Sequence, residues 1–153
     1  MKKYFLNAVA MIAALSAAIP SAQAVSPVTG TFDVVINLTS DCTVDTTAAV
    51  AGAVFNYTSF QPGNATFSTG FDVKCTNTMP ITSVTLDSLA VTDAATNLAY
   101  TLALVGVPAT GSGAIQTVTV NGTMALGQGG TCGAASCTNA ASANKTRTVT
   151  VTF

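Results

Sequence analysis

Apolar side chains recur at every second position along most of this chain, and this period constrains its fold more than any other feature. In the run 65–75, phenylalanine, valine and cysteine share one face, and Ser68, Asp72 and Lys74 share the other. Such alternation predicts a β-strand that buries one face. Similar strands are expected at 31–39, 82–91, 98–104, 117–126 and 146–153. Turn-forming residues separate these runs and no sustained 3.6-residue period follows residue 24, so the sequence predicts an all-β, antiparallel β-sandwich.

The first residues have the pattern of a secretory signal peptide. Two lysines precede an apolar stretch, and the small residues that end at Ala24 are typical of a cleavage site. We expect residues 1–24 to be removed by cleavage between Ala24 and Val25. The apolar stretch is short and contains a proline, which disfavours a membrane-spanning helix, and after removal of the signal no segment is apolar for long enough to span a bilayer.

Charged residues are rare, because Lys, Arg, Asp and Glu make up only 7% of the 153 residues. After loss of the two signal lysines, carboxylates outnumber cations. This balance disfavours a nucleic-acid partner, which would need a basic surface. The chain has no histidine and no glutamate, and its six acidic residues are dispersed aspartates, so we expect no enzyme, no cofactor and no metal site.

Four cysteines in an exported chain predict two disulfides. Four cysteines allow three pairings. The spacing of Cys132 and Cys137 is short enough for a local loop, which leaves Cys42 to pair with Cys75. A zinc site is disfavoured, because the cysteines lack close paired spacing and the chain has no histidine. We expect 127–143 to be an exposed loop held by the local bridge.

The run 31–39 lies directly after the predicted cleavage site, where most domains carry dispensable residues. Its apolar face consists of Phe32, Val34, Ile36 and Leu38. We therefore expect an N-terminal segment, 25–40, that offers a strand to a neighbouring sheet, followed by a single domain, 41–153. Two alternatives are that the segment pairs within its own domain and that it is disordered.

Four stretches in this order resemble subunits of archaic chaperone–usher pili, the spore coat protein U domain family. They are Val28–Val44, Phe71–Asn77, Leu98–Leu102 and Thr148–Phe153, and together they span nearly all of the chain after the signal. Two features depart from the family pattern. The loop between Cys132 and Cys137 is not general in the family, and Asn144–Arg147 stands where a glycine-x-tyrosine-x-aspartate motif is usual.

The resemblance implies an incomplete immunoglobulin-like β-sandwich that is completed by donor-strand exchange. A periplasmic chaperone would first fill the gap, facing the last strand through Val149, Val151 and Phe153. Secretion through an outer-membrane usher would then replace the chaperone with the N-terminal strand of an identical or related pilin subunit. The implied function is a structural subunit of a cell-surface pilus (fimbrium) that supports adhesion and biofilm formation. A secreted coat or matrix protein that does not polymerise and a ligand-binding β-sandwich adhesin are the alternatives.

Overall fold

The computed structural model of the chain describes residues 29–140, 142 and 145–153. The predicted signal peptide and its cleavage site between Ala24 and Val25 lie outside these residues. The chain divides into two compact units after Ile36. The larger unit is 37–153. Across the described residues, no helix has the length and apolar character needed to cross a membrane.

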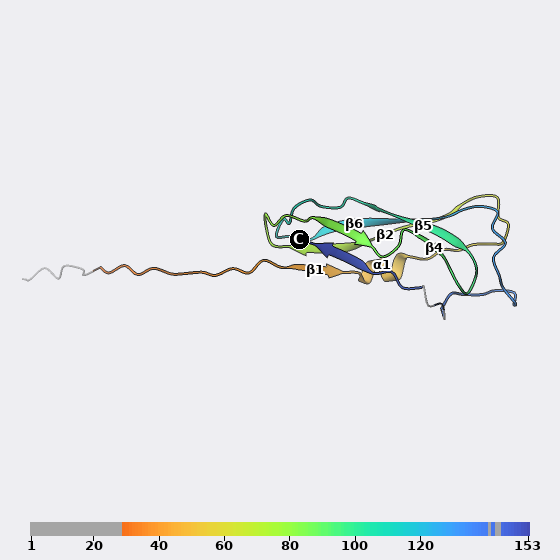
Figure 1. The fold of residues 1–153 in the computed structure, drawn as a ribbon, viewed down its shortest axis with the longest axis horizontal. Helices are drawn as coiled ribbons and strands as arrows, with labels where there is room; N and C mark the ends of the chain where they lie inside the picture. Colours follow the sequence, from red (N-terminus) through yellow and green to blue (C-terminus); the bar gives the residue numbers. More distant parts are fainter. Residues whose placement is uncertain (1–28, 141, 143–144) are drawn as a thin grey trace, which may run out of the picture. The chain divides into compact units, whose positions relative to one another are not determined.

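Where the structure describes it, the larger unit consists of antiparallel strands with one short helix (Figure 1). In chain order the elements are β1 (Cys42–Asp45), α1 (Thr47–Gly52), β2 (Ala65–Cys75), β3 (Ser83–Leu86), β4 (Ala90–Thr92), β5 (Ala99–Val105), β6 (Gln116–Met124) and β7 (Val149–Thr152). Each pair of neighbouring strands is antiparallel. The predicted all-β class is confirmed.

The strands form two sheets of unequal size. One sheet has the order β1-β2-β6-β5-β4, and the other contains only β3 and β7. β2 and β6 form the longest pairing, from Ala65 opposite Met124 to Val73 opposite Gln116. Gly122 lies opposite Phe67, and a Cβ at this glycine would collide with the phenylalanine ring, so the close pairing of β2 and β6 at this point requires glycine.

Both sheets contribute to one hydrophobic core. Its buried members are Phe71, Val73, Cys75, Met79, Ile81, Val84, Leu102, Val118 and Val120. Val84 belongs to the small sheet, and the β7 valines pack against the same cluster while remaining only partly buried. Because buried apolar area is the main stabilising contribution, this shared core is what holds the two sheets together.

Most of the expected strands are confirmed, with shifts at their ends. The run 65–75 is β2, and its inner side chains are buried toward its C-terminal end. The runs 98–104 and 117–126 are β5 and β6. The second of these is shorter than expected, because β6 ends at Met124 and Leu126, inside the expected range, is 55% exposed.

The prediction of a single strand over 82–91 is wrong. The chain forms β3 and then β4, which belong to different sheets. The break has a local cause, because Asp87 Oδ1 accepts a hydrogen bond from the Ser88 N–H and Ser88 Oγ donates to the Ala90 carbonyl. Such side-chain bonds compete with the strand ladder.

The helix α1 was not expected, because the sequence shows no helical period there. It is only six residues long and buries no residue, so it has no apolar stripe by which it could be predicted. Asp45 Oδ1 accepts hydrogen bonds from the N–H and the hydroxyl of Thr47 at its start. These two bonds lower the pKa of Asp45.

Candidate strand-accepting edge

The described residues of the N-terminal segment, 29–40, contain no strand in the structure. The apolar side chains of its predicted donor face are all exposed: Phe32 86%, Val34 70%, Ile36 84% and Leu38 79%. Within the described part of the chain, no strand pairs with this segment. An exposed stripe of four large apolar side chains is typical of an interaction site.

The strand β7 has a hydrogen-bonded neighbour on one side only, β3, among the described residues. The Asp87 N–H donates to the Thr148 carbonyl over 3.0 Å, so the main chain of Thr148 is directed toward β3. In an antiparallel ladder, successive residues direct their N–H and C=O groups to opposite sides. Val149 and Val151 therefore direct theirs to the unpaired edge.

The side chains of the same two valines point toward the core. Val149 and Val151 pack against the core cluster but are only partly buried, whereas Phe153 lies just beyond β7 and is 54% exposed. Two of the three residues predicted for the inward face, Val149 and Val151, therefore lie on it, although without full cover. Any strand added at this edge would gain backbone hydrogen bonds from the two valines and would bury more of their apolar surface.

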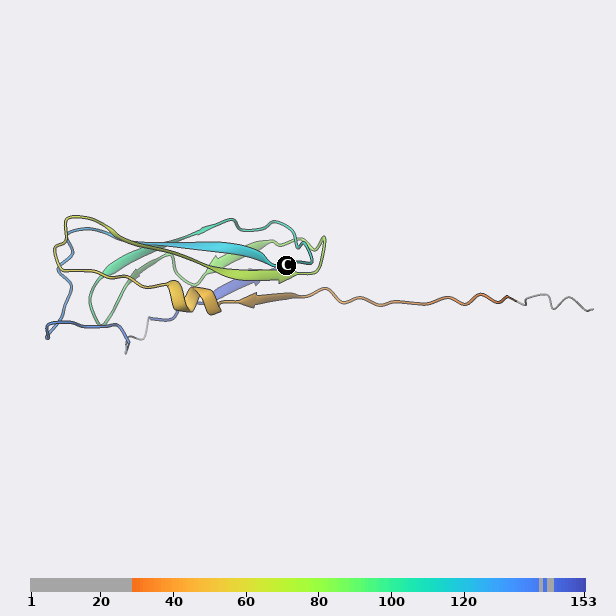
Figure 2. The same cartoon turned by 180° about the vertical axis from the view of Figure 1, so that it is seen from behind.

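β1 is an edge strand of the larger sheet. In Figures 1 and 2, which view the molecule from opposite sides, β1 is drawn in orange and β7 in dark blue. No backbone pairing joins the two strands in the structure, since β1 pairs only with β2 and β7 only with β3. Each of the two strands thus has one unpaired edge among the described residues.

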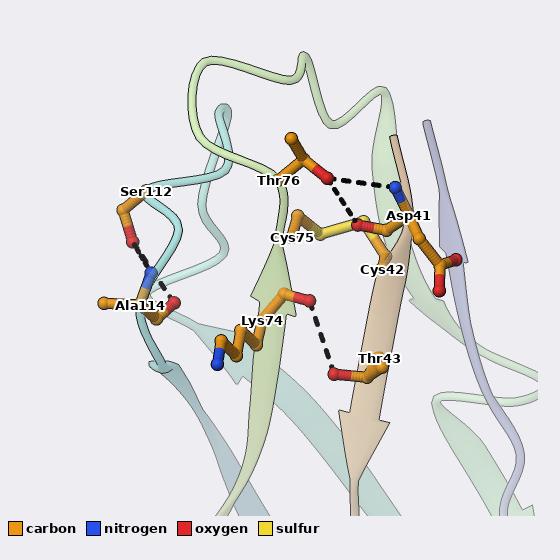
Figure 3. The surroundings of a disulfide bond; sticks show 8 residues. All are labelled: Asp41, Cys42, Thr43, Lys74, Cys75, Thr76, Ser112 and Ala114. Atoms are coloured by element: carbon orange, nitrogen blue, oxygen red, sulfur yellow. Dashed lines mark hydrogen bonds between the residues drawn. A yellow bond between two sulfur atoms is a disulfide. The ribbon is translucent and has the colours of Figure 1, made fainter. Parts of the chain in front are cut away.

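A disulfide holds β1 in place (Figure 3). Cys42 and Cys75 lie directly opposite each other in the β1–β2 pairing, with 4.1 Å between their Cα atoms. Beside the bridge, the Thr76 N–H donates to the Asp41 carbonyl, and the Asp41 N–H donates to Thr76 Oγ1, each over 3.0 Å. These bonds join the residue before β1 to the residue after β2. The predicted pairing of Cys42 with Cys75 is confirmed.

β7 is held at its N-terminal end by one aspartate. Asp87 Oδ1 accepts a hydrogen bond from the Thr148 N–H over 3.2 Å, and Asp87 Oδ2 lies 3.4 Å from Arg147 Nη1. The Arg147 side chain is only 19% exposed. Burial raises the pKa of Tyr100, and the positive charge of Arg147 partly opposes this rise. These contacts hold the start of β7, whose one hydrogen-bonded neighbour among the described residues is β3.

A second aspartate holds the segment that leads into β7. Asp93 is 3% exposed, and its Oδ1 accepts hydrogen bonds from the Thr96 N–H and hydroxyl over 2.8 and 2.9 Å. Burial acts to raise the pKa of Asp93, but hydrogen bonds from Ser142, Thr96 and Asn139 lower it by more, so the net shift is downward. Asp93 thus ties the turn after β4 to the residues that precede β7.

The loop after β6 contains the second predicted disulfide, Cys132–Cys137, which is also confirmed. The side chain of Gln128 accepts from the Ala99 N–H over 2.6 Å and donates to the Ala99 carbonyl over 2.8 Å. The Thr131 N–H donates to the Thr96 carbonyl. The base of the loop is therefore bonded to the start of β5, while its disulfide is exposed.

The remaining features offer little chemistry. A shallow hollow of about 330 Å³ lies over β4 and β5 and is lined mainly by alanine and threonine. A second, of about 310 Å³, lies beside the Cys42–Cys75 bridge. Asp72 accepts a hydrogen bond from the Thr117 hydroxyl, which is a structural role. Among the residues that the structure describes, no three His, Cys, Asp or Glu side chains gather as a metal ion would require.

Comparisons with known proteins found no matching family model, no matching curated protein and no matching solved structure. An assignment of function therefore depends on the residues and contacts of this chain. The open edge of β7 and the exposed N-terminal stripe are the two features that call for an explanation.

Proposed function

We propose that this chain is a structural subunit of a chaperone–usher pilus, exported through the periplasm, and that it polymerises by donating its N-terminal segment. In this proposal, residues of about 28–39 become a strand in the sheet of a neighbouring subunit, where they pair with the free edge of β7. The fold is then an immunoglobulin-like sandwich that lacks one strand. The observation that carries the proposal is the presence, in one chain, of an unpaired strand edge over a partly covered core and an apolar stripe without cover.

The energetics favour donation. Burying four large apolar side chains contributes roughly 1.5–3 kcal/mol each, before the cost of ordering the segment and associating two subunits. Main-chain bonds to Val149 and Val151 add to this gain, because strand addition satisfies the edge donors and acceptors. Asp33 and Asn37 lie on the other face of the donated strand, where they stay in water.

The proposal includes a periplasmic chaperone and an outer-membrane usher. A subunit with an open edge and a partly exposed core needs temporary cover before assembly, because unpaired edges aggregate. The two disulfides fit an oxidising compartment such as the periplasm. Phe153 extends the apolar face of β7, so its deletion should lower periplasmic accumulation of the subunit in cells that contain the chaperone.

The test uses two neighbouring substitutions that add the same charge. Ile36→Asp places a carboxylate on the donor face, and Asn37→Asp places one on the solvent face. A buried unpaired charge is costly, so the first should abolish the polymer ladder that resists heat and detergent, and the second should leave it intact. Both variants should still co-purify with the chaperone, because the segment does not belong to the subunit's own core.

Three results would contradict the proposal. A ladder that persists in Ile36→Asp would exclude donation through this face. Loss of chaperone binding together with the ladder would place the segment in the subunit's own fold. Absence of any ladder from the unsubstituted chain with its chaperone and usher would favour a secreted coat or matrix protein that does not polymerise.

A further inference from the structure

The two disulfides of this chain lie in different environments. Cys75 is 1% exposed and belongs to the shared core, against which the partly buried Cys42 packs. Cys132 and Cys137 are both exposed, as is every residue from 131 to 138. A small thiol in solution can therefore reach the Cys132–Cys137 bridge in the folded chain, whereas the core shields the other bridge until the strands around it open.

The loop that carries the exposed bridge is held at its start by hydrogen bonds. The side chain of Gln128 bonds to both main-chain groups of Ala99, and the Thr131 N–H donates to the Thr96 carbonyl over 2.6 Å. Gly130 lies so close to the same turn that a Cβ at this position would be 3.1 Å from the Thr96 carbonyl oxygen. The start of the loop is thus bonded to residues 96–99 whether or not the disulfide is closed.

The end of the loop is held on the same turn. The side chains of Asn139 and Ser142 form hydrogen bonds to Asp93, and the Ser142 N–H donates to the Asn139 carbonyl over 2.9 Å. Asp93 in turn accepts a hydrogen bond from the Thr96 N–H. Because both ends of the loop are bonded to residues 93–99, opening of the bridge frees its tip, 132–137, and leaves the contacts at its base in place.

The loop presents no charge that would repel the attacking group. The nucleophile in thiol–disulfide exchange is a thiolate, which is an anion. Residues 127–140 contain no charged side chain, and the carboxylate to which the loop is bonded, Asp93, is 3% exposed. Exposed disulfides are also those that serve as labile, regulatory or catalytic bonds, in contrast to buried structural ones.

We propose that Cys132–Cys137 is a thiol-exchange site of the folded protein, which an external dithiol opens while Cys42–Cys75 stays closed. The site gives the surface of the chain two thiols that can be exposed reversibly without disturbing either sheet. The inference does not depend on the proposed function, because it requires only the folded larger unit.

The exchange takes place in two steps. A thiolate of the dithiol attacks one loop sulfur, a mixed disulfide forms, and the other loop sulfur leaves as a thiolate and takes up a proton. The second thiol of the reagent loses its proton and attacks the mixed disulfide, which releases the remaining loop sulfur as a thiol. The loop disulfide gains two electrons and two protons, and the dithiol loses the same and becomes a disulfide.

Selective labelling tests the site. The folded chain is incubated with dithiothreitol, free thiols are blocked with iodoacetamide at successive times, and the labelled cysteines are identified by peptide mapping. We expect Cys132 and Cys137 to be labelled at least about 10-fold faster than Cys42 and Cys75. Equal rates for the two bridges in the folded chain would overturn the proposal.

The same experiment in urea separates the effect of the fold from that of the local sequence. All four cysteines are then accessible, so the advantage of the exposed bridge should largely disappear. An advantage that persists unchanged in urea would show that exposure in the fold is not its cause, and would contradict the proposal.

Thermal melting followed by circular dichroism tests whether the base of the loop survives. The chain with only Cys132 and Cys137 reduced and blocked should keep a cooperative transition, and so should the double variant Cys132→Ser, Cys137→Ser. Loss of the cooperative transition in either sample would overturn the proposal. These results do not depend on the polymer ladder, so the exchange site and the proposed function can fail separately.

Discussion

The same four residues, Thr-Val-Thr-Val, occur twice in this chain, at 117–120 in β6 and at 148–151 at β7. In β6 the two valines are 0% and 6% exposed, and the strand has neighbours on both sides. In β7 the corresponding valines are only partly buried, and the strand has one neighbour. An identical local sequence thus reaches two levels of burial, and the difference lies in the missing neighbour of β7. The alternation of apolar residues thus determines which side chains of a strand face the core. The neighbouring strands determine how completely those side chains are buried.

The largest effect is expected where a covalent bridge supports the pairing of two strands. Replacing both Cys42 and Cys75 by alanine should lower the free energy of unfolding by about 3–4 kcal/mol, since that bridge closes the longer loop. Replacing Cys132 and Cys137 should cost about 2 kcal/mol. Urea denaturation of the unpolymerised subunit measures both. Equal losses would show that the bridge between β1 and β2 has no special role.

A matched pair of substitutions tests the two Thr-Val-Thr-Val strands themselves. Val118→Ala should destabilise the unpolymerised subunit by about 2–3 kcal/mol, because it leaves a cavity in a fully packed site. Val151→Ala should cost about 1 kcal/mol, because its site is only partly covered. The same urea titration compares them. Similar losses in the two variants would mean that the core beneath β7 is already complete.

The smallest effect is expected from the pH dependence of Asp93, which holds the segment before β7. The folded-state pKa is lowered, so this carboxylate stabilises the fold fully above its unfolded value, near 3.9, and less as pH falls through the folded value. The melting temperature of the original chain should therefore fall toward that of Asp93→Asn as the solution is acidified from neutral pH. If the difference in melting temperature between the original chain and Asp93→Asn stays constant as the pH falls, the charge of Asp93 does not have this stabilising role.

Alternation predicted the strands β2, β5 and β6 because each buries one face against the shared core. It failed at 82–91, where bonds around Asp87 and Ser88 break the ladder, and such bonds leave no trace in a hydrophobic pattern. The helix α1 was missed for the same reason, since it buries nothing.

The candidate site was predictable in part. The donor face of 31–39 and the inward valines of the last run followed from the period alone. The open edge of β7 did not follow from the period, because it depends on which strands pair across the fold. Asp87 and Asp93 carried no motif, so their anchoring of β7 could only be found from the contacts.

Amide hydrogen exchange tests the central claim most directly, because it reports on each strand edge separately. The Ile36→Asp variant supplies an unpolymerised subunit, and a synthetic peptide of residues 28–39 supplies the donor strand. We predict that the Val149 and Val151 amides exchange readily without the peptide and become protected with it, while Val118 and Val120 are protected in both states. Protection of Val149 and Val151 before the peptide is added, or exchange unchanged at saturating peptide, would contradict an open edge that accepts this segment.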